Sequence, residues 1–248
     1  MGTLFLVHYL EFARSFEGNP EGATPESIAA WLQRNWLTKR GGGNWNYDPA
    51  MEVLVLAFAG HITLEQAIEH CHRYWHPHAR VENERVVRCF WRYAVGNKSR
   101  VYRRSYFAAP VGRWRGRNIF IGVKAPLVRV SNDEVLAVVP IFRKNFTPCE
   151  KETDLSLTIV REFSLREGYR DIDTEYLRAR GVDGSLDRRL IVDRGSHRRL
   201  YSSEQLDTFA QKYAKAVSLL ADAGLGLEQP NFAGYRIWDP DQPPFPGI

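Results

Sequence analysis

The chain has 248 residues, with a hydrophobic fraction of 44%, a charged fraction of 25% and a formal net charge of +5, which excludes a wholly disordered or fibrous protein. Its longest uninterrupted apolar run, residues 53–59, is far shorter than the roughly 20 residues of a transmembrane helix, so we expect no membrane partner. The first residues contain no basic leader and the three cysteines have no framework spacing, so we expect a cytoplasmic protein with free thiols.

The first part of the chain predicts one strand followed by helices. Residues 3–12 are apolar on both faces of an extended chain, which is typical of a buried strand. Thr24 can cap a helix that has Pro25 at its first position and ends near Arg40, before three consecutive glycines. Three further helices are predicted at residues 49–59, 63–75 and 82–94, and Pro77 is expected to end the second of these.

The apolar period then changes from 3.6 to 2, which indicates strands at residues 101–107, 119–123, 127–130, 134–142 and 155–163. A polar stretch follows, and it contains a short predicted helix at residues 174–180. Ser202 and Gln205 form a capping box before the clearest amphipathic helix of the chain, which Gly224 can end. A last strand is predicted at residues 235–238. Because helices and strands do not alternate regularly, the sequence favours the α+β class over a doubly wound α/β sheet.

Positive charge is concentrated in residues 73–117. This segment has twelve basic residues against two acidic ones, a local charge of +10, so the rest of the chain carries −5. Eleven of the twelve are arginine, whose planar guanidinium suits phosphate, and nine aromatic residues of the same segment can stack on unpaired bases. The segment therefore predicts nucleic-acid binding, although aromatic residues in a core beneath a solvated arginine surface would give the same composition. The candidate RNA-binding side chains are Arg85, Arg88, Arg92, Lys98, Arg100, Arg103, Arg104, Arg113, Arg115 and Arg117.

Two groups of polar residues suggest a metal-dependent enzyme as an alternative. Five histidines lie between His61 and His78, but Pro77 interrupts their helix and no Cys-x-x-Cys pair adds ligands. The second group consists of the carboxylates Asp171, Asp173 and Glu175. Neither spacing is that of an established metal site, so we expect no metal.

A non-enzymatic DNA-binding protein of a mobile element is another alternative, because two helices flank Gly60. The apolar positions after this glycine are out of register for a helix-turn-helix motif, which disfavours a helix that reads bases. No phosphate-loop or dinucleotide motif is present in the sequence, so we expect no cofactor.

Three glycines, Gly224, Gly226 and Gly234, lie between the last predicted helix and the last predicted strand. Glycine allows the backbone of a ligand to approach the protein backbone closely. Together with the opening strand at residues 3–12 and the helix at residues 25–40, this stretch resembles the repeat-RNA-processing endoribonucleases of CRISPR systems, which belong to the RAMP superfamily.

The resemblance implies an α+β fold with a ferredoxin-like or RRM-like core, formed by residues 1–47 and 95–248, into which the helical segment 48–94 is inserted. It implies a hairpin or single-stranded repeat RNA as partner, with other subunits of a ribonucleoprotein complex as further partners. It also implies metal-independent RNA cleavage, in which a ribose 2′-hydroxyl attacks the adjacent phosphorus. The family often uses a histidine in or beside its first helix, whereas this helix has arginines. The candidate catalytic residues are Arg34, Arg40, Arg236 and His8, and Gly224, Gly226 and Gly234 join the candidate RNA-binding residues.

Overall fold

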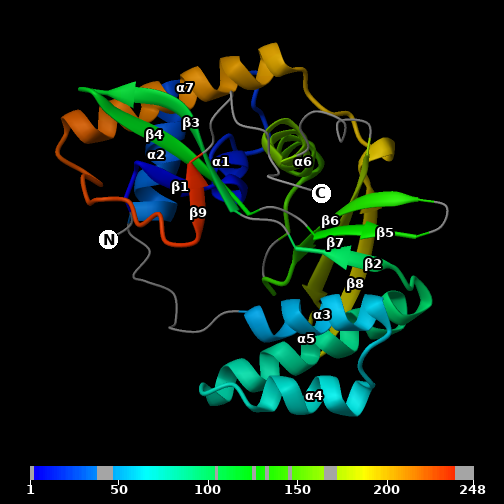
Figure 1. Cartoon of the computed structure of the whole chain (residues 1–248). Coiled ribbons are helices and arrows are strands. Elements are labelled where there is room, and N and C mark those ends of the chain that lie inside the picture. The colour runs from blue at the N-terminus through cyan, green and yellow to red at the C-terminus, as the bar shows by residue number, and fades with distance from the viewer. Residues whose placement is uncertain are drawn as a thin grey trace.

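The computed structural model describes residues 3–37, 47–103, 106–124, 127–131, 134–144, 147–164 and 172–237. It confirms the α+β class: two mixed sheets carry helices packed on them (Figure 1), an arrangement compatible with a ferredoxin-like core. Arg40, Arg104 and Asp171 lie outside the described residues.

The first sheet has four strands in the order β1-β4-β3-β9. Strands β3 and β4 form an antiparallel hairpin, and the short strands β1 and β9 each add to it in parallel. The strands are β1 (Leu6–His8), β3 (Tyr106–Trp114), β4 (Arg117–Val123) and β9 (Tyr235–Ile237). The helices that share an apolar core with this sheet are α1 (Tyr9–Arg14), α2 (Pro25–Leu32), α6 (Glu150–Ser164) and α7 (Ser203–Asp222). A π-helical turn, η1 (Gln33–Leu37), continues α2.

The second sheet has five strands in the order β2-β5-β6-β7-β8. Strands β6 and β7 are parallel and are joined through α6, whereas the other neighbours are antiparallel. The strands are β2 (Arg100–Tyr102), β5 (Leu127–Val130), β6 (Val135–Ile141), β7 (Asp173–Gly181) and β8 (Arg188–Arg194). Three helices form a second apolar core with this sheet and lie beside it in Figure 1: α3 (Asp48–Ala59), α4 (Leu64–His72) and α5 (Pro77–Gly96). A single 3₁₀ turn, η2 (Gly195–His197), follows β8.

Local signals explain where several helices begin and end. Thr24, Thr63 and Ser202 each form a capping box with the residue three positions later, which confirms the predicted starts of α2, α4 and α7. Gly60 ends α3 with a backbone φ of 70°, a conformation that side-chain-bearing residues rarely adopt. The prediction that Pro77 ends the preceding helix is wrong: α4 already ends at His72, and Pro77 begins α5, since its fixed φ suits the first helical position.

The strand predicted at residues 155–163 is wrong, because this segment belongs to α6. The hydroxyl groups of Thr153, Ser156 and Thr158 each donate to the carbonyl oxygen four residues earlier, so the helix satisfies its own polar side chains. Residues 155–160 are all buried, including Ser156 and Thr158, so this stretch has no exposed residue that would reveal the helical period. The alternation of apolar and hydroxyl side chains in these residues therefore does not mark a strand.

Two other predictions are also wrong, because contacts with distant segments decide the structure there. Residues 174–180 form most of strand β7 instead of a helix, because this segment pairs on both sides, with β6 and with β8. Residues 3–12 contain only a three-residue strand, after which His8 caps α1. In both places contacts with distant segments override the local propensity.

Candidate nucleic-acid interface

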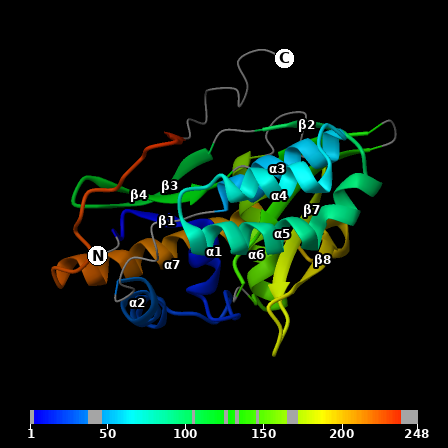
Figure 2. The same ribbon diagram turned by 90° about the horizontal axis from the view of Figure 1, so that it is seen from below.

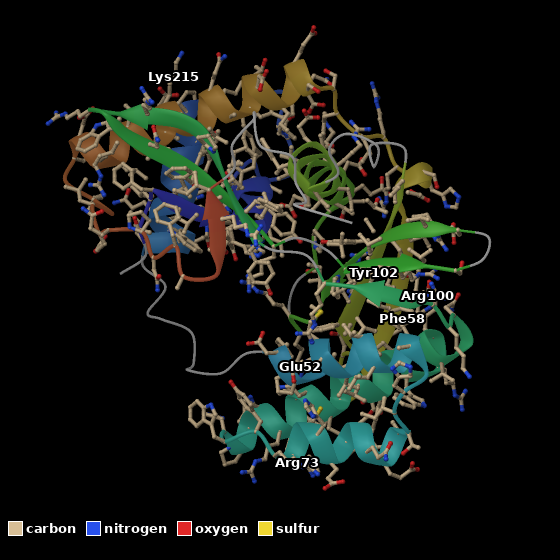
Figure 3. All side chains as sticks on the ribbon, viewed as in Figure 1. Glu52, Phe58, Arg73, Arg100, Tyr102 and Lys215 are labelled. Atoms are coloured by element: carbon tan, nitrogen blue, oxygen red, sulfur yellow. The ribbon has the colours of Figure 1, made fainter. Side chains whose placement is uncertain are left out.

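Strand β2 presents basic and aromatic side chains at an edge of the second sheet. It is the first strand in the order of that sheet and pairs with β5. Because side chains alternate along a strand, Arg100 and Tyr102 lie on one face, while Val101 packs against the second apolar core. Arg100 is exposed, and the side chain of Tyr102 is 51% exposed; Figure 3 labels both on β2. An aromatic ring and a guanidinium are thus presented together to solvent.

Two further cations flank this strand. Lys98 precedes the strand, and its side chain passes close to Gly60. A Cβ atom added at Gly60 would lie 3.4 Å from Cε of Lys98. Arg103 directly follows the strand and is exposed. Within the described ranges, neither of these cations nor Arg100 forms an ion pair with a carboxylate. We call Lys98, Arg100, Tyr102 and Arg103 the β2 surface.

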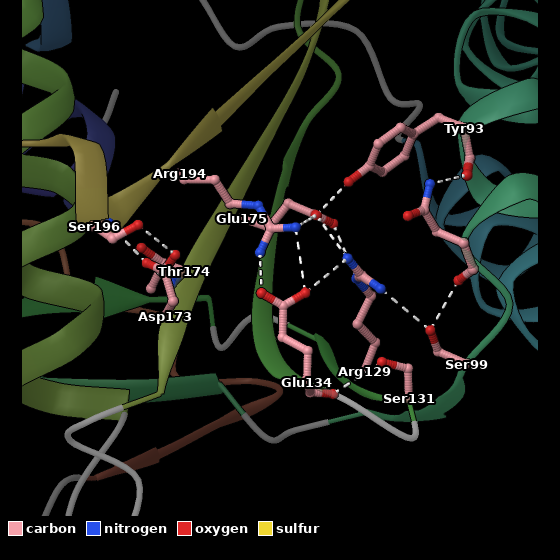
Figure 4. Close-up of polar contacts among 11 residues, drawn as sticks. Tyr93, Ser99, Arg129, Ser131, Glu134, Asp173, Thr174, Glu175, Arg194 and Ser196 are labelled. Atoms are coloured by element: carbon pink, nitrogen blue, oxygen red, sulfur yellow. Dashed lines mark hydrogen bonds and ion pairs between the residues drawn. The ribbon is translucent and has the colours of Figure 1, made fainter.

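A buried network fixes the position of the β2 surface (Figure 4). Arg129 on β5 donates from Nε and Nη2 to the Glu175 carboxylate, at 3.2 and 2.9 Å, and from Nη1 to the hydroxyl of Ser99, at 3.3 Å. Ser99 immediately precedes β2, and its backbone N–H donates to the carbonyl oxygen of Phe58 at the end of α3. Tyr93 of α5 donates to the same Glu175 carboxylate, and both burial and this carboxylate raise the tyrosine pKa. The edge strand is therefore held from α3, α5 and β7.

The other predicted RNA-binding arginines are mostly committed to contacts within the chain. Arg85 pairs with Glu82, Arg88 with Glu84 at 2.8 Å, and Arg115 with Asp222 at 2.9 Å. Arg113 donates to Asn118 at 2.8 Å, and Arg117 donates to the carbonyl oxygen of Leu227 and lies 3.8 Å above the ring of Phe5. Arg92 is exposed on α5 and makes no ion pair in the part of the chain that the structure describes.

The three C-terminal glycines have structural reasons to be glycine. Gly224, Gly226 and Gly234 have φ values of 78°, 62° and 80°, in the left-handed region that glycine adopts freely. A Cβ atom at Gly226 would lie 2.4 Å from Cγ of Leu4, so the loop packs tightly on the chain that leads into β1. The positive φ values, together with the contact with Leu4 at Gly226, explain the glycines without a ligand.

The candidate catalytic residues that the structure describes lie on three different elements: Arg34 on η1, Arg236 on β9 and His8 on β1. Arg34 lies in η1 and pairs at 3.5 Å with Glu17, and both side chains are exposed. Arg236 is exposed on β9. Figure 2 shows helix α2, which η1 continues, and the red strand β9 in different parts of the molecule.

His8 is the candidate with the most unusual surroundings. Its Nδ1 accepts the backbone N–H of Leu10 at 3.3 Å, which caps α1. Burial, followed by the charges of Arg143 and Lys124, lowers its pKa well below the ordinary histidine value. The ring is therefore neutral at pH 7, and its engaged Nδ1 is not free to accept a proton.

The histidine and carboxylate groups are dispersed over separate contacts. His70 bonds Glu52 at 2.8 Å, His72 bonds Glu84 at 2.6 Å, and Nδ1 of His76 caps α5. Asp173 accepts from the backbone N–H and the hydroxyl of Ser196 (Figure 4). The described ranges contain no group of three or more His, Cys, Asp or Glu residues that could hold a metal ion.

Comparisons of this chain with protein-family models, with curated proteins and with solved structures found no match. Of the helices that the structure describes, none combines the length and the apolar character needed to cross a membrane.

Proposed function

We propose that this protein binds single-stranded RNA along the β2 surface. The observation that carries the proposal is the exposed Tyr102 ring between cations that have no carboxylate partner among the described residues. Arginine and lysine side chains neutralise phosphates, and a tyrosine ring stacks on a base that is not already stacked in a duplex. Arg129, Glu175 and Ser99 hold the backbone that leads into β2, so the strand itself needs little ordering when RNA binds.

The resemblance to CRISPR repeat-processing endoribonucleases supports RNA over DNA as the ligand. It also carries the proposal of metal-independent cleavage of repeat RNA. Arg34, on η1, is paired with Glu17, and Arg236 lies on β9, so we take binding at the β2 surface as the better supported function.

The test is a binding titration of the full chain with a labelled single-stranded uridine oligonucleotide at several salt concentrations. Arg100→Ala and Arg103→Ala remove one phosphate contact each, and we expect each to reduce the slope of log K against log salt by about 0.7. Tyr102→Ala is expected to weaken binding by about 1–3 kcal/mol, and Tyr102→Phe to retain most of it, because phenylalanine keeps the stacking face.

Arg189→Ala is the matched control, because Arg189 is an exposed arginine on β8, at the opposite end of the same sheet order. The proposal is wrong if Arg189→Ala weakens binding as much as Arg100→Ala does. It is equally wrong if a matched duplex binds as tightly as the single strand and is insensitive to Tyr102→Ala. A single-stranded DNA of the same sequence, bound more tightly than the RNA, would replace RNA as the ligand.

A further inference from the structure

A second group of polar side chains lies where strands β1 and β4 end. These strands are parallel, and His8 at the end of β1 is opposite Gly122 of β4. Lys124 follows β4, and Tyr106 begins β3, which pairs with β4 on its other side. Tyr235 begins β9 and is opposite Tyr106. The carboxyl ends of parallel strands are common ligand sites, because several chain segments present side chains there.

Distances between these side chains show that they converge. The Lys124 ammonium nitrogen lies 5.2 Å from the centre of the Tyr106 ring. The centres of the Tyr106 and Tyr235 rings are 5.9 Å apart. A Cβ atom at Gly122 would lie only 3.0 Å from the hydroxyl oxygen of Tyr235, so this hydroxyl reaches the sheet because residue 122 is glycine. Burial raises the pKa of both tyrosines, so their hydroxyl groups keep their protons at neutral pH.

Arg143 adds a second permanent charge. It follows β6, and its Nη1 donates to Glu11 at 2.8 Å, while its side chain remains 51% exposed. The charge of Arg143 lowers the pKa of Lys124, after the larger effect of desolvation, and both cations lower the pKa of His8. The carboxylate of Asp48, at the start of α3, raises the pKa of Lys124.

The donors of this group outnumber the acceptors that satisfy them. In the described part of the chain, the Lys124 ammonium and the hydroxyl groups of Tyr106 and Tyr235 form no hydrogen bond. Because Nδ1 of His8 is an acceptor for Leu10, the neutral ring carries its proton on Nε2, which is a further donor. Converging donors around the Lys124 charge suit an anion with several oxygen atoms.

We propose that Lys124, Tyr106 and Tyr235 form a binding site for a phosphate group. The site is separate from the β2 surface and does not depend on RNA binding there. The phosphate group belongs either to a free phosphate or mononucleotide, or to an RNA strand that continues past Arg103. Arg103 is close enough for its charge to lower the pKa of Tyr106.

The first test is calorimetric titration of the full chain with inorganic phosphate, and then with adenosine 5′-monophosphate and with adenosine. Lys124→Met is expected to weaken phosphate binding about tenfold or more, because it removes a charged donor. Tyr235→Phe, which keeps the ring and removes only the hydroxyl, is expected to weaken it about threefold to tenfold. Asp48→Asn is expected to tighten it about threefold, because a competing surface charge is lost.

Lys215→Met is the control, because Lys215, labelled in Figure 3, is an exposed lysine on α7, a helix that contributes no residue to this site. Phosphate affinity in Lys215→Met should equal that of the unaltered protein. The site is refuted if Lys124→Met and Lys215→Met bind phosphate equally, if adenosine binds as tightly as its monophosphate, or if Asp48→Asn leaves affinity unchanged or lower. Thermal unfolding of each variant confirms that a loss of binding is not a loss of fold.

The source of the phosphate is identified with RNA that carries either a 5′-phosphate or a 5′-hydroxyl. If Lys124→Met weakens only the phosphorylated strand, the site takes a terminal phosphate; if it weakens both, the site takes an internal phosphodiester. Arg100→Ala separates this proposal from RNA binding at the β2 surface, because it must leave the titration with inorganic phosphate unchanged.

Discussion

Replacing Glu175 with glutamine is expected to destabilise the protein strongly. The Glu175 side chain is fully buried, and that of Arg129 is 4% exposed, so the carboxylate is the main compensation for a guanidinium that water cannot reach. Glutamine keeps the shape of the side chain but removes the charge, which leaves the Arg129 charge buried without it. Breaking such a pair typically costs about 3–5 kcal/mol. Arg194, at 3.3 Å from the same carboxylate, adds to the cost.

The measurement is urea unfolding at pH 7, followed by circular dichroism, with Glu134→Gln as the control. Glu134 is 43% exposed and pairs with Arg194 at 2.8 Å, so its loss should cost about 0–1 kcal/mol. The double variant Arg129→Met with Glu175→Leu should recover most of the lost stability, since it removes both charges together. Equal free energies of unfolding for Glu175→Gln and Glu134→Gln would refute the reasoning.

Two further predictions concern the candidate catalytic residues. If the chain cleaves repeat RNA as the resemblance implies, cleavage should persist in EDTA. Arg34→Ala should not reduce the rate about 10²–10³-fold, since Arg34 is exposed and paired with Glu17; a loss of that size in a single-turnover assay would contradict this reasoning. His8 should make stability pH-dependent in a defined direction: because its pKa is lowered in the folded state, the unfolded chain binds the extra proton first, and stability falls as the pH drops below about 6.5. His8→Asn, which keeps a capping side chain, should reduce this fall, as measured by urea unfolding at pH 7 and pH 5, and an unchanged pH dependence would show that His8 is not its source.

The sequence predicted those features whose causes are local. The capping residues Thr24, Thr63 and Ser202 act on backbone groups three positions away, so a single stretch of sequence contains the whole signal. Helix α6 and strand β7 could not be predicted in this way. The burial of one and the pairing of the other are supplied by segments far away in the chain.

The candidate site divides in the same manner. The concentration of arginine in residues 73–117 was visible, and Arg100 and Arg103 lie within it. The three-dimensional positions of the carboxylates decide which arginines stay unpaired. Asp222 of α7 forms an ion pair with Arg115, but no described carboxylate forms one with Arg100. Tyr235 and Lys124 carry no sequence signal that connects them, because only the parallel addition of β9 to β3 brings Tyr235 over Gly122.

The position of α6 makes the two sheets one cooperative unit. Its buried side chains, such as Leu155 and Ile159, belong to the same apolar core as Ile121 of the first sheet and Val139 and Tyr176 of the second. Unfolding either sheet would therefore expose apolar surface on the helix and remove packing from the other sheet. We expect one unfolding transition by every probe, and a substitution in one sheet should lower the protection of amide hydrogens in both.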